Sequence, residues 1–407
     1  MRIGEFSKKH NITHDTVRHY IDMGLLIPKK DGHHYRFGAI HDKDIRKIIE
    51  LKKLEFSLTE IQKILNFNRI AGKTSREYNS YYLNRLEDKK KYILKCQDKF
   101  KEIESILDHK IKDIKSIEMN SKNKLGINID SLHILNCPIC RKSLNIKDGS
   151  IENNMIINGI VSCACGYKAR IENGIYIGGE SRDSLEQTNK IPSKLDFMES
   201  SSTEFINFFH DGMSLLIQNI KDRAKHSNYI LELENCSGTF LMQYYENLPP
   251  ETTYIVINRD ISRLESLKKN LEDNNNHERF IFICEDYNLI PIKTQSIDII
   301  IDHWMTKEYQ AEKDLFLPDY ISELSKSGGL LVGAYPCVCT LDRDIYVKSL
   351  RRKGYFNPEF IGDKFSALGF KDEKFIRIGP VIEENPYNLD IKDKSLYLNI
   401  YSAIKGV

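Results

Sequence analysis

The 407-residue sequence contains no long apolar run, a single tryptophan and almost no net charge. No stretch approaches the roughly 18 apolar residues that span a bilayer, and the N-terminus lacks a signal-peptide pattern. These absences predict a cytoplasmic protein with no membrane contact. Nine cysteines in a long intracellular chain indicate metal ligation or buried thiols rather than disulfides. The length predicts two to four domains.

The net charge of +2 conceals two regions of opposite charge. Up to Leu125 the chain carries 28 Lys and Arg against 18 Asp and Glu, an excess of ten positive charges. The remainder therefore carries a net charge of about −8. A basic first part is typical of nucleic-acid binding, and the acidic remainder indicates a different task.

The stretch from Glu77 to Glu118 repeats apolar residues every seven positions and contains no Gly or Pro. One set of the repeat is Leu86, Ile93, Phe100, Leu107 and Ile114, and three residues further on lie Lys89, Cys96, Ile103, Lys110 and Ile117. Such a seam is usually buried against another helix. We expect the same helix of a second copy as its partner, and the alternative is packing within one domain. The two lysines predict a seam less regular than a zipper.

The residues before this helix predict a compact, helical reading head with a β-hairpin. Two short helices are expected at residues 3–10 and 16–23, with Thr13 or Asp15 capping the second one. This spacing is that of a helix-turn-helix, whose second helix enters a major groove. Asp31-Gly32 between basic and aromatic residues predicts a hairpin wing. Further helices are expected at residues 44–54 and 57–65, the latter opening on a capping box.

These segments resemble MerR-type transcriptional regulators, chiefly through Ile3–Phe6, Thr16–Tyr20, Gly24–Pro28 and Tyr35–Phe37. The resemblance implies a winged helix-turn-helix that binds double-stranded promoter DNA of two-fold symmetry as an antiparallel coiled-coil homodimer. The DNA-binding positions predicted here are Thr16, Arg18, Tyr20, Lys29, Lys30, Tyr35 and Arg36. Packing in the core is the alternative role for Tyr20 and Phe37. The wing histidines His33 and His34 are expected near phosphate.

Two close cysteine pairs follow the long helix. They are Cys137 with Cys140, and Cys163 with Cys165. Four thiolates at this spacing suit a structural, tetrahedral Zn²⁺, with paired free thiols as the alternative. A segment of this size buries too little apolar surface to stay folded without a bound metal or a similar cross-link. The run from Gly166 to Ile175 resembles zinc ribbons that accompany RNA methyltransferases, including bacterial ribosomal guanine methyltransferases.

From Asn228 onward, apolar runs alternate with helical segments. The expected strands are Tyr229–Leu233, Thr253–Ile257, Phe280–Ile283, Ile297–Ile301 and Gly329–Val332. Continuous Ile, Val and Leu runs at this spacing predict a parallel sheet covered on both faces. In such sheets, ligands bind at the carboxyl ends of the strands.

The loops at those ends resemble class I S-adenosylmethionine-dependent methyltransferases. The resemblance implies an α/β Rossmann-like domain and assigns cofactor-binding roles to Glu232, Gly238, Asp260, Asp286 and Tyr287. Glu234 and Cys236 stand where the family has glycines, which let the backbone approach the ligand closely. Catalytic residues remain unknown. His303 is a candidate to take a proton and Trp304 to stack on a flat substrate, at the mouth where a methyl acceptor binds.

The sequence therefore predicts a multidomain regulator. Residues 1–76 form an all-α winged helix-turn-helix and residues 77–120 a coiled-coil helix. Residues 131–180 form a zinc ribbon, and residues 195–407 a methyltransferase-like domain. The predicted function is transcriptional regulation, with this last domain sensing S-adenosylmethionine or another small molecule. The alternative is a regulator that is also an active methyltransferase on RNA or a small-molecule acceptor.

Overall fold

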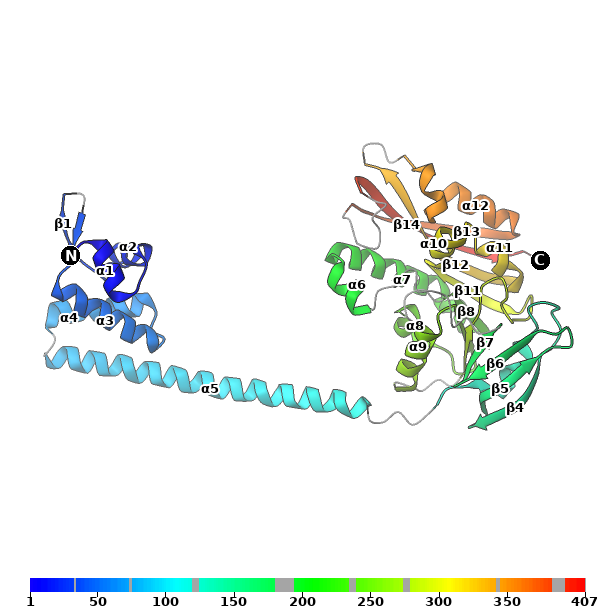
Figure 1. Ribbon diagram of the computed structural model, residues 1–407, viewed down its shortest axis with the longest axis horizontal. Helices are drawn as coiled ribbons and strands as arrows, with labels where there is room; N and C mark the ends of the chain where they lie inside the picture. The colour runs from blue at the N-terminus through cyan, green and yellow to red at the C-terminus, as the bar shows by residue number, and fades with distance from the viewer. Residues whose placement is uncertain are drawn as a thin grey trace. The chain divides into compact units, whose positions relative to one another are not determined.

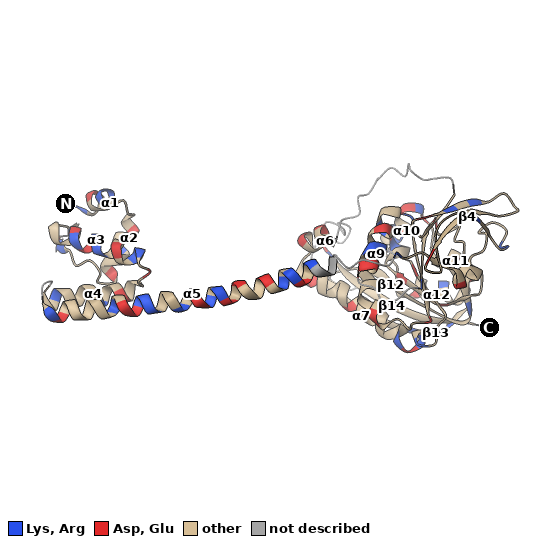
Figure 2. Cartoon of the chain, turned by 90° about the horizontal axis from the view of Figure 1, so that it is seen from below, with Lys and Arg blue, Asp and Glu red and all other residues tan. Residues whose placement is uncertain are grey.

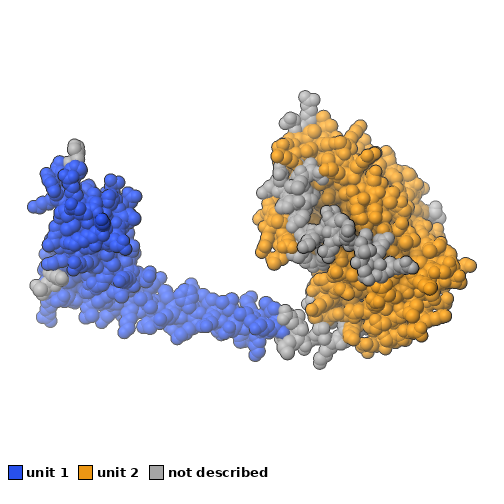
Figure 3. Space-filling view, in the orientation of Figure 1, with its two compact units in different colours: residues 1–115 blue, residues 116–407 orange. Residues whose placement is uncertain are grey.

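The computed structural model describes residues 1–32, 34–72, 75–118, 124–179, 194–233, 239–273, 279–341, 345–382 and 392–406. The chain divides into two compact units, residues 1–115 and residues 116–407, which are coloured separately in Figure 3. The first unit has one hydrophobic core, and the second has a core on each face of a sheet.

Four helices pack around the core of the first unit, and their caps explain where they begin. Thr13 accepts a hydrogen bond from the Thr16 amide (3.1 Å), which sets the start of the second helix. Ser57 and Glu60 form the expected capping box of the fourth. The four helices are α1 (Ile3–His10), α2 (His14–Asp22), α3 (Ala39–Lys53) and α4 (Leu58–Ala71).

The predicted wing is a short antiparallel hairpin between α2 and α3. Its strands are β1 (Lys29–Asp31) and β2 (His34–Arg36), and Lys29 lies opposite Arg36. Phe37 follows the hairpin and stacks on Phe6 with 4.3 Å between ring centroids. The hairpin is therefore fixed to the core of the head at its base.

The long helix α5 (Arg76–Glu118) begins as part of the head and continues as an exposed helix (Figure 1). Tyr78 is buried in the head core, and Leu86 packs against it. Further along the seam, Phe100 and Ile114 are 68 % and 62 % exposed. Figure 2 shows that basic and acidic residues alternate with other residues along this helix. The apolar seam is thus uncovered in the single chain.

One seam residue has a different role from the one expected. The Lys89 ammonium group hydrogen-bonds a carboxylate oxygen of Glu60 (3.1 Å) and the backbone carbonyl of Glu55 (3.0 Å). Its side chain is 13 % exposed. Lys89 therefore docks α5 onto the head, and a coiled-coil partner would not have to cover its charge.

The second unit is built on one continuous mixed sheet, whose strand order is β13-β14-β12-β11-β8-β9-β10-β7-β6-β5-β3, with β4 paired to β5. Five neighbouring strands of this sheet are parallel. Numbered one to five by their order in the sequence, they lie side by side in the order 3-2-1-4-5, which is the order of doubly wound nucleotide-binding folds. These strands are β8 (Tyr229–Leu233), β9 (Thr253–Asn258), β10 (Phe280–Cys284), β11 (Ile297–His303) and β12 (Ser325–Thr340). Antiparallel β14 (Lys394–Lys405) and β13 (Phe370–Val381) complete one side. The predicted Rossmann-like fold is confirmed.

Helices cover both faces of this sheet, as the continuous apolar strands require. One face packs against α7 (Thr203–Ala224), α8 (Thr239–Tyr244) and α9 (Ile261–Asp273), and α6 (Lys194–Ser200) adjoins α7 through Phe197. The other face packs against α10 (Met305–Lys313), α11 (Pro318–Ile321) and α12 (Pro358–Ala367). Short 3₁₀ turns lie at Ile129–Ile134, Tyr245–Asn247, Ser322–Leu324 and Lys348–Lys353.

The cysteine-bearing segment extends the same sheet. It contains β3 (Ile127–Asn128), β4 (Asn145–Glu152), β5 (Met155–Ser162), β6 (Lys168–Glu172) and β7 (Ile175–Gly178). β7 pairs in parallel with β10, and Phe282 lies opposite Ile175. The two segments predicted as a ribbon and a methyltransferase-like domain therefore share backbone hydrogen bonds. Within the described residues, no helix combines the length and apolar character required to cross a bilayer.

Candidate functional site

The first candidate surface is the start of α2 in the head. Thr16 is half-buried, and its hydroxyl lies 2.8 Å from that of Thr13, so the cap holds this turn in place. Arg18 is exposed over 66 % of its side chain, and its guanidinium lies 3.6 Å from Asp15. This contact is a weak surface pair, so Arg18 can exchange it for a phosphate.

The wing, which follows α2 in the chain, carries exposed positive charge. Lys29, Lys30 and Arg36 are exposed, whereas Tyr35 is half-buried. Arg36 donates from Nε to Asp31 (3.0 Å) on the facing strand, which holds its side chain at the hairpin. Like charges directly opposite each other destabilise a hairpin, so the pairing of Lys29 with Arg36 is consistent with an anionic partner.

Tyr20 has the packing role that the sequence left open as an alternative. It is 4 % exposed and belongs to the core of the head, as does Phe37. Its ring therefore packs α2 against the core of the head. His33 lies outside the described residues, while His34 is exposed on β2.

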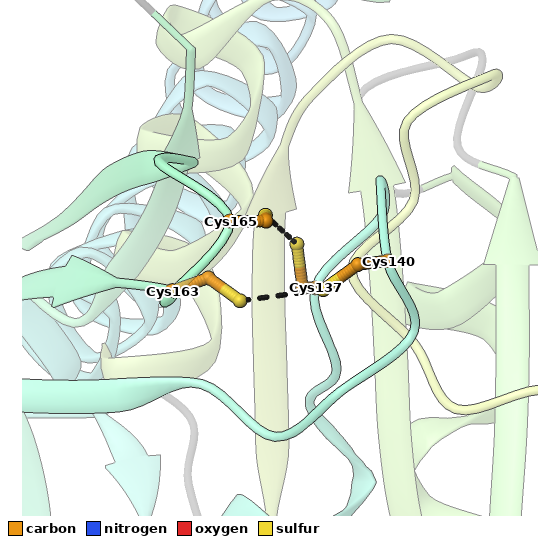
Figure 4. Close-up of side chains that lie close together, drawn as sticks. All are labelled: Cys137, Cys140, Cys163 and Cys165. Carbon is orange, nitrogen blue, oxygen red and sulfur yellow. Dashed lines mark hydrogen bonds between the residues drawn. The ribbon is translucent and has the colours of Figure 1, made fainter.

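The four cysteines of the second unit converge on one point (Figure 4). Cys137 Sγ lies 3.5 Å from Cys165 Sγ, and Cys140 Sγ lies 3.4 Å from Cys163 Sγ. All four sulfur atoms lie within 4.8 Å of one another. The thiols of a tetrahedral zinc site with Zn–S bonds of about 2.3 Å stand about 3.8 Å apart, so the spacing fits that ion.

Local turns explain why the thiols face one another. The Arg141 amide donates to the Cys137 carbonyl (2.9 Å), and the Gly166 amide donates to the Cys163 carbonyl (3.0 Å). Gly166 has a φ of +95°, a conformation that glycine adopts readily. A hydrogen bond involving the Lys142 backbone lowers the pKa of the Cys140 thiol to about 7, whereas desolvation and neighbouring thiols raise the pKa values of Cys163 and Cys165. A bound cation is what would hold all four groups as thiolates.

The cysteine segment contacts the loop that follows β10. The Asn136 amide donates to the Pro291 carbonyl (3.0 Å), and Arg141 forms an ion pair with Glu323. Glu285, which is 6 % exposed, accepts from the Tyr167 hydroxyl (3.4 Å). One end of the expected cofactor loop is therefore held by the cysteine segment.

The predicted cofactor residues that the structure describes lie at the carboxyl edge of the parallel strands, and they differ in exposure and in hydrogen bonding. Glu232 on β8 is 2 % exposed and accepts a hydrogen bond from the Tyr254 hydroxyl (2.6 Å). Asp260 follows β9, and its side chain is 53 % exposed. Its carboxylate accepts from the Ser262 amide (2.9 Å), which caps α9. Asp260 is thus the accessible carboxylate among these predicted residues.

The next strand places its two predicted residues inside the protein. Asp286 is 5 % exposed and accepts from the Tyr309 hydroxyl (3.1 Å). Burial and this carboxylate raise the pKa of Tyr309 well above its ordinary value. Tyr287 is 2 % exposed and meets Tyr309 edge-on at 5.5 Å. Arg259 lies over the Tyr287 and Tyr309 rings and pairs with Glu312. The glycine turn after β8, with Glu234, Cys236 and Gly238, lies outside the described residues.

The end of β11 holds the two residues expected at an acceptor mouth. His303 is 2 % exposed and Trp304 5 % exposed. Burial lowers the pKa of His303 to about 3, so the imidazole is neutral near pH 7 and a poor proton acceptor. Asp302, beside them, accepts hydrogen bonds from the Thr306 amide (3.1 Å) and hydroxyl.

Three features of this region escaped the sequence-based predictions. They are the Tyr309 partner of Asp286, the Arg259–Glu312 ion pair, and the pairing of β7 with β10. The first two join residues more than 20 positions apart, and no local pattern marks them. The apolar run Ile175–Ile177 is a signal that could have identified β7 as a buried strand.

Residues 1–68 match the family described as MerR HTH family regulatory protein. The HTH-type transcriptional regulator ZntR homolog of Haemophilus influenzae is 30 % identical over 81 residues, which are 19 % of this chain and 60 % of that protein. The HTH-type transcriptional regulator HmrR of Rhizobium leguminosarum bv. viciae is 33 % identical over 66 residues, 16 % of this chain and 51 % of that protein. The chain thus spans little more than half the length of these curated relatives.

Solved structures resemble about half of the chain at low identity. Phosphoethanolamine N-methyltransferase 2 of Haemonchus contortus, in complex with S-adenosyl-L-methionine, is 14 % identical with a TM-score of 0.34, covering 54 % of this chain and 61 % of that one. N-methyltransferase NodS of Bradyrhizobium japonicum is 14 % identical with a TM-score of 0.35, covering 49 % of this chain and 98 % of that one. Residues 1–68 therefore match a MerR-type helix-turn-helix family, and the second unit contains a Rossmann-like sheet.

Proposed function

We propose that the protein is a DNA-binding transcriptional regulator of the MerR type whose C-terminal region senses a ligand. The observation that carries this proposal is the match of residues 1–68 to a regulator family, together with the exposed cationic wing. We assign DNA reading to residues 1–76 and dimerisation to residues 77–120. We assign metal binding to residues 131–180 and ligand binding to residues 195–407, acting in the cytoplasm.

The exposed seam of α5 supports a homodimer. Four seam residues beyond the head are between 39 % and 68 % exposed in the single chain, namely Ile93, Phe100, Leu107 and Ile114. Their spacing of seven residues forms one stripe, which the α5 helix of a second copy would bury. Two reading heads would then face a two-fold symmetric operator.

The proposed ligand of the second unit is S-adenosylmethionine or another small molecule, and the cysteine cluster would hold a structural Zn²⁺. Asp260 supports the first assignment because an exposed carboxylate at the end of the second strand can accept ribose hydroxyls. The sulfur spacing supports the second assignment. Methyl transfer was the alternative function. Burial lowers the pKa of His303 and so weakens it as the proton acceptor that this alternative would use.

DNA binding is tested by selecting an operator from a random duplex pool with the full chain. The selected site should be two-fold symmetric, and its affinity should fall steeply with salt. Arg36→Ala should weaken binding to all sequences and reduce the salt slope by about one, because one phosphate contact is lost. Arg170→Ala removes a charge from the cysteine segment and should change neither. An operator without symmetry, or unchanged binding by Arg36→Ala, contradicts this part of the proposal.

Ligand sensing is tested by calorimetry with S-adenosylmethionine on the full chain. Asp260→Asn keeps an oxygen that caps α9 but removes the charge, so the helix should remain folded. Charge-assisted hydrogen bonds contribute roughly 1.5–3 kcal/mol, and the variant should therefore bind at least about tenfold more weakly. Asp222→Ala, at an exposed carboxylate on α7, should bind normally. Operator affinity that does not change with S-adenosylmethionine would exclude it as the effector.

A further inference from the structure

The end of β11 buries two ring nitrogens that lack partners. His303 Nε2 and Trp304 Nε1 have no hydrogen-bond partner among the residues that the structure describes. Most buried polar atoms in folded proteins are paired, and leaving one unpaired costs about 1–3 kcal/mol. Two such atoms lie on adjacent residues at the edge of the sheet where ligands bind, and they destabilise the folded chain. A bound molecule that formed hydrogen bonds with them would remove this free-energy cost.

The backbone at this point is also strained. Trp304 has a φ of +68°, the left-handed conformation that bulky residues rarely adopt. Asp302 fixes the turn by accepting hydrogen bonds from Thr306 at the start of α10. Successive strand residues face opposite sides of a sheet, so Asp302 points away from the face that His303 occupies. Strain of this kind is concentrated at ligand-binding sites.

Two phenylalanine rings pack against the rings that carry these nitrogens. Phe209 of α7 lies 4.8 Å from His303 and 6.2 Å from Trp304, measured between ring centroids. Phe240 of α8 lies 6.2 Å from His303. The planes are tilted by 56°, 43° and 43°, so the rings are in contact without being stacked. Phe197 of α6 packs on the outer side of Phe209 at 5.5 Å.

We propose that this cluster binds an uncharged, planar heteroaromatic molecule with a hydrogen-bond acceptor on its edge. The indole N–H of Trp304 can only donate, so the ligand must accept there, while one imidazole nitrogen of His303 donates or accepts. A charged ligand is disfavoured because the site is desolvated. Because the Phe209 ring packs against both His303 and Trp304, binding requires that ring to turn aside, so that the ligand replaces one aromatic contact by another. This inference rests on the proposed function, since it names the ligand class that the second unit senses.

The chain provides its own reporter, because Trp304 is the single tryptophan. Benzimidazole is the probe, and indane, a bicycle of the same size without nitrogen, is its matched control. Titration of the full chain should change the Trp304 emission, and benzimidazole should bind at least about tenfold more tightly than indane. His303→Phe should reduce this preference, because only the hydrogen bond from Trp304 then remains. His210→Phe, at an exposed histidine one residue from Phe209, should keep it.

Thermal unfolding of His303→Phe separates lost binding from lost folding. The variant replaces an unpaired buried nitrogen by carbon, so its midpoint should be equal to or above that of the parent chain. Equal binding of the two probes, an unchanged preference in His303→Phe, or no emission change would overturn the site. If the emission responds but operator affinity does not, the site stands and ligand control of DNA binding fails. If S-adenosylmethionine alters operator affinity while benzimidazole leaves the emission unchanged, the proposed function stands and this site fails.

Discussion

The contact between the cysteine segment and β10 makes Gly178→Ala an informative substitution. A Cβ atom at Gly178 would overlap Glu285 Oε2, lie 2.5 Å from Glu285 Cδ and 3.0 Å from the Tyr167 hydroxyl. The Glu285 carboxylate would have to move, yet it accepts hydrogen bonds from the Asp286 amide (2.9 Å) and from Tyr167. Overpacking costs about 1–3 kcal/mol, and a lost hydrogen bond to a carboxylate adds about 1.5–3 kcal/mol. We therefore expect a loss of about 2.5–6 kcal/mol in the free energy of unfolding.

Urea unfolding followed by Trp304 fluorescence measures this loss, because the single tryptophan reports the second unit alone. Gly149→Ala is the control: it lies on exposed β4, where the nearest atom to an added Cβ is the Asn158 carbonyl oxygen at 3.3 Å. It should change stability by less than about 1 kcal/mol.

A double-mutant cycle identifies the cause. In a Glu285→Ala background the overlap is gone, so Gly178→Ala should cost at least about 2 kcal/mol less than in the parent chain. Strictly additive losses would show that the carboxylate does not resist the methyl group. That result would refute the packing argument, whatever the size of the single effects.

Three further predictions concern the seam, the metal and the head. Phe100→Lys places a charge in the centre of the seam and should give monomers in sedimentation. The control Leu94→Lys, which lies off the seam, should stay dimeric. A dimeric Phe100→Lys variant would mean that another surface mediates association. Cys140→Ser removes one thiolate, so elemental analysis should find less than one zinc per chain, and full retention of zinc would exclude this ligand set. Lys9 and His10 hold the pKa of Asp42 below its ordinary value, so the stability from this carboxylate is present above about pH 4 and is lost as pH falls through the folded pKa. Acid unfolding of Asp42→Asn should lack this component, and an identical acid transition would contradict the assignment.

Local sequence patterns were sufficient for the elements whose cause is local. Thr13 and the Ser57–Glu60 box marked helix starts, and Asp31-Gly32 marked the wing. The cysteine spacing brought four thiols to one point because two tight turns determine their geometry. The five apolar runs became five neighbouring parallel strands, since only a doubly covered sheet buries both of their faces.

The predictions failed to anticipate features that depend on tertiary partners. Heptad spacing placed Lys89 in the seam, but its ammonium group forms a hydrogen-bonded ion pair with the Glu60 carboxylate of the head. The predicted cofactor residue Asp286 is engaged by Tyr309, whose approach depends on how α10 packs. The sequence left Tyr20 with two roles, DNA contact or core packing, and only the packing of the head shows that its ring is buried. Periodicity identifies a face but not what lies opposite it.

The pairing of β7 with β10 has a consequence for synthesis of the chain. Ile175 and Phe282 are partners separated by 107 positions, so β7 leaves the ribosome long before the strand that covers it. During that interval its apolar residues and open backbone groups form an exposed sheet edge, which is prone to pairing with other chains. Closing so long a loop is slow, because chain entropy must be lost before the contact forms. A nascent chain of this protein is therefore most vulnerable to aggregation after the cysteine segment has emerged and before β10 has followed it.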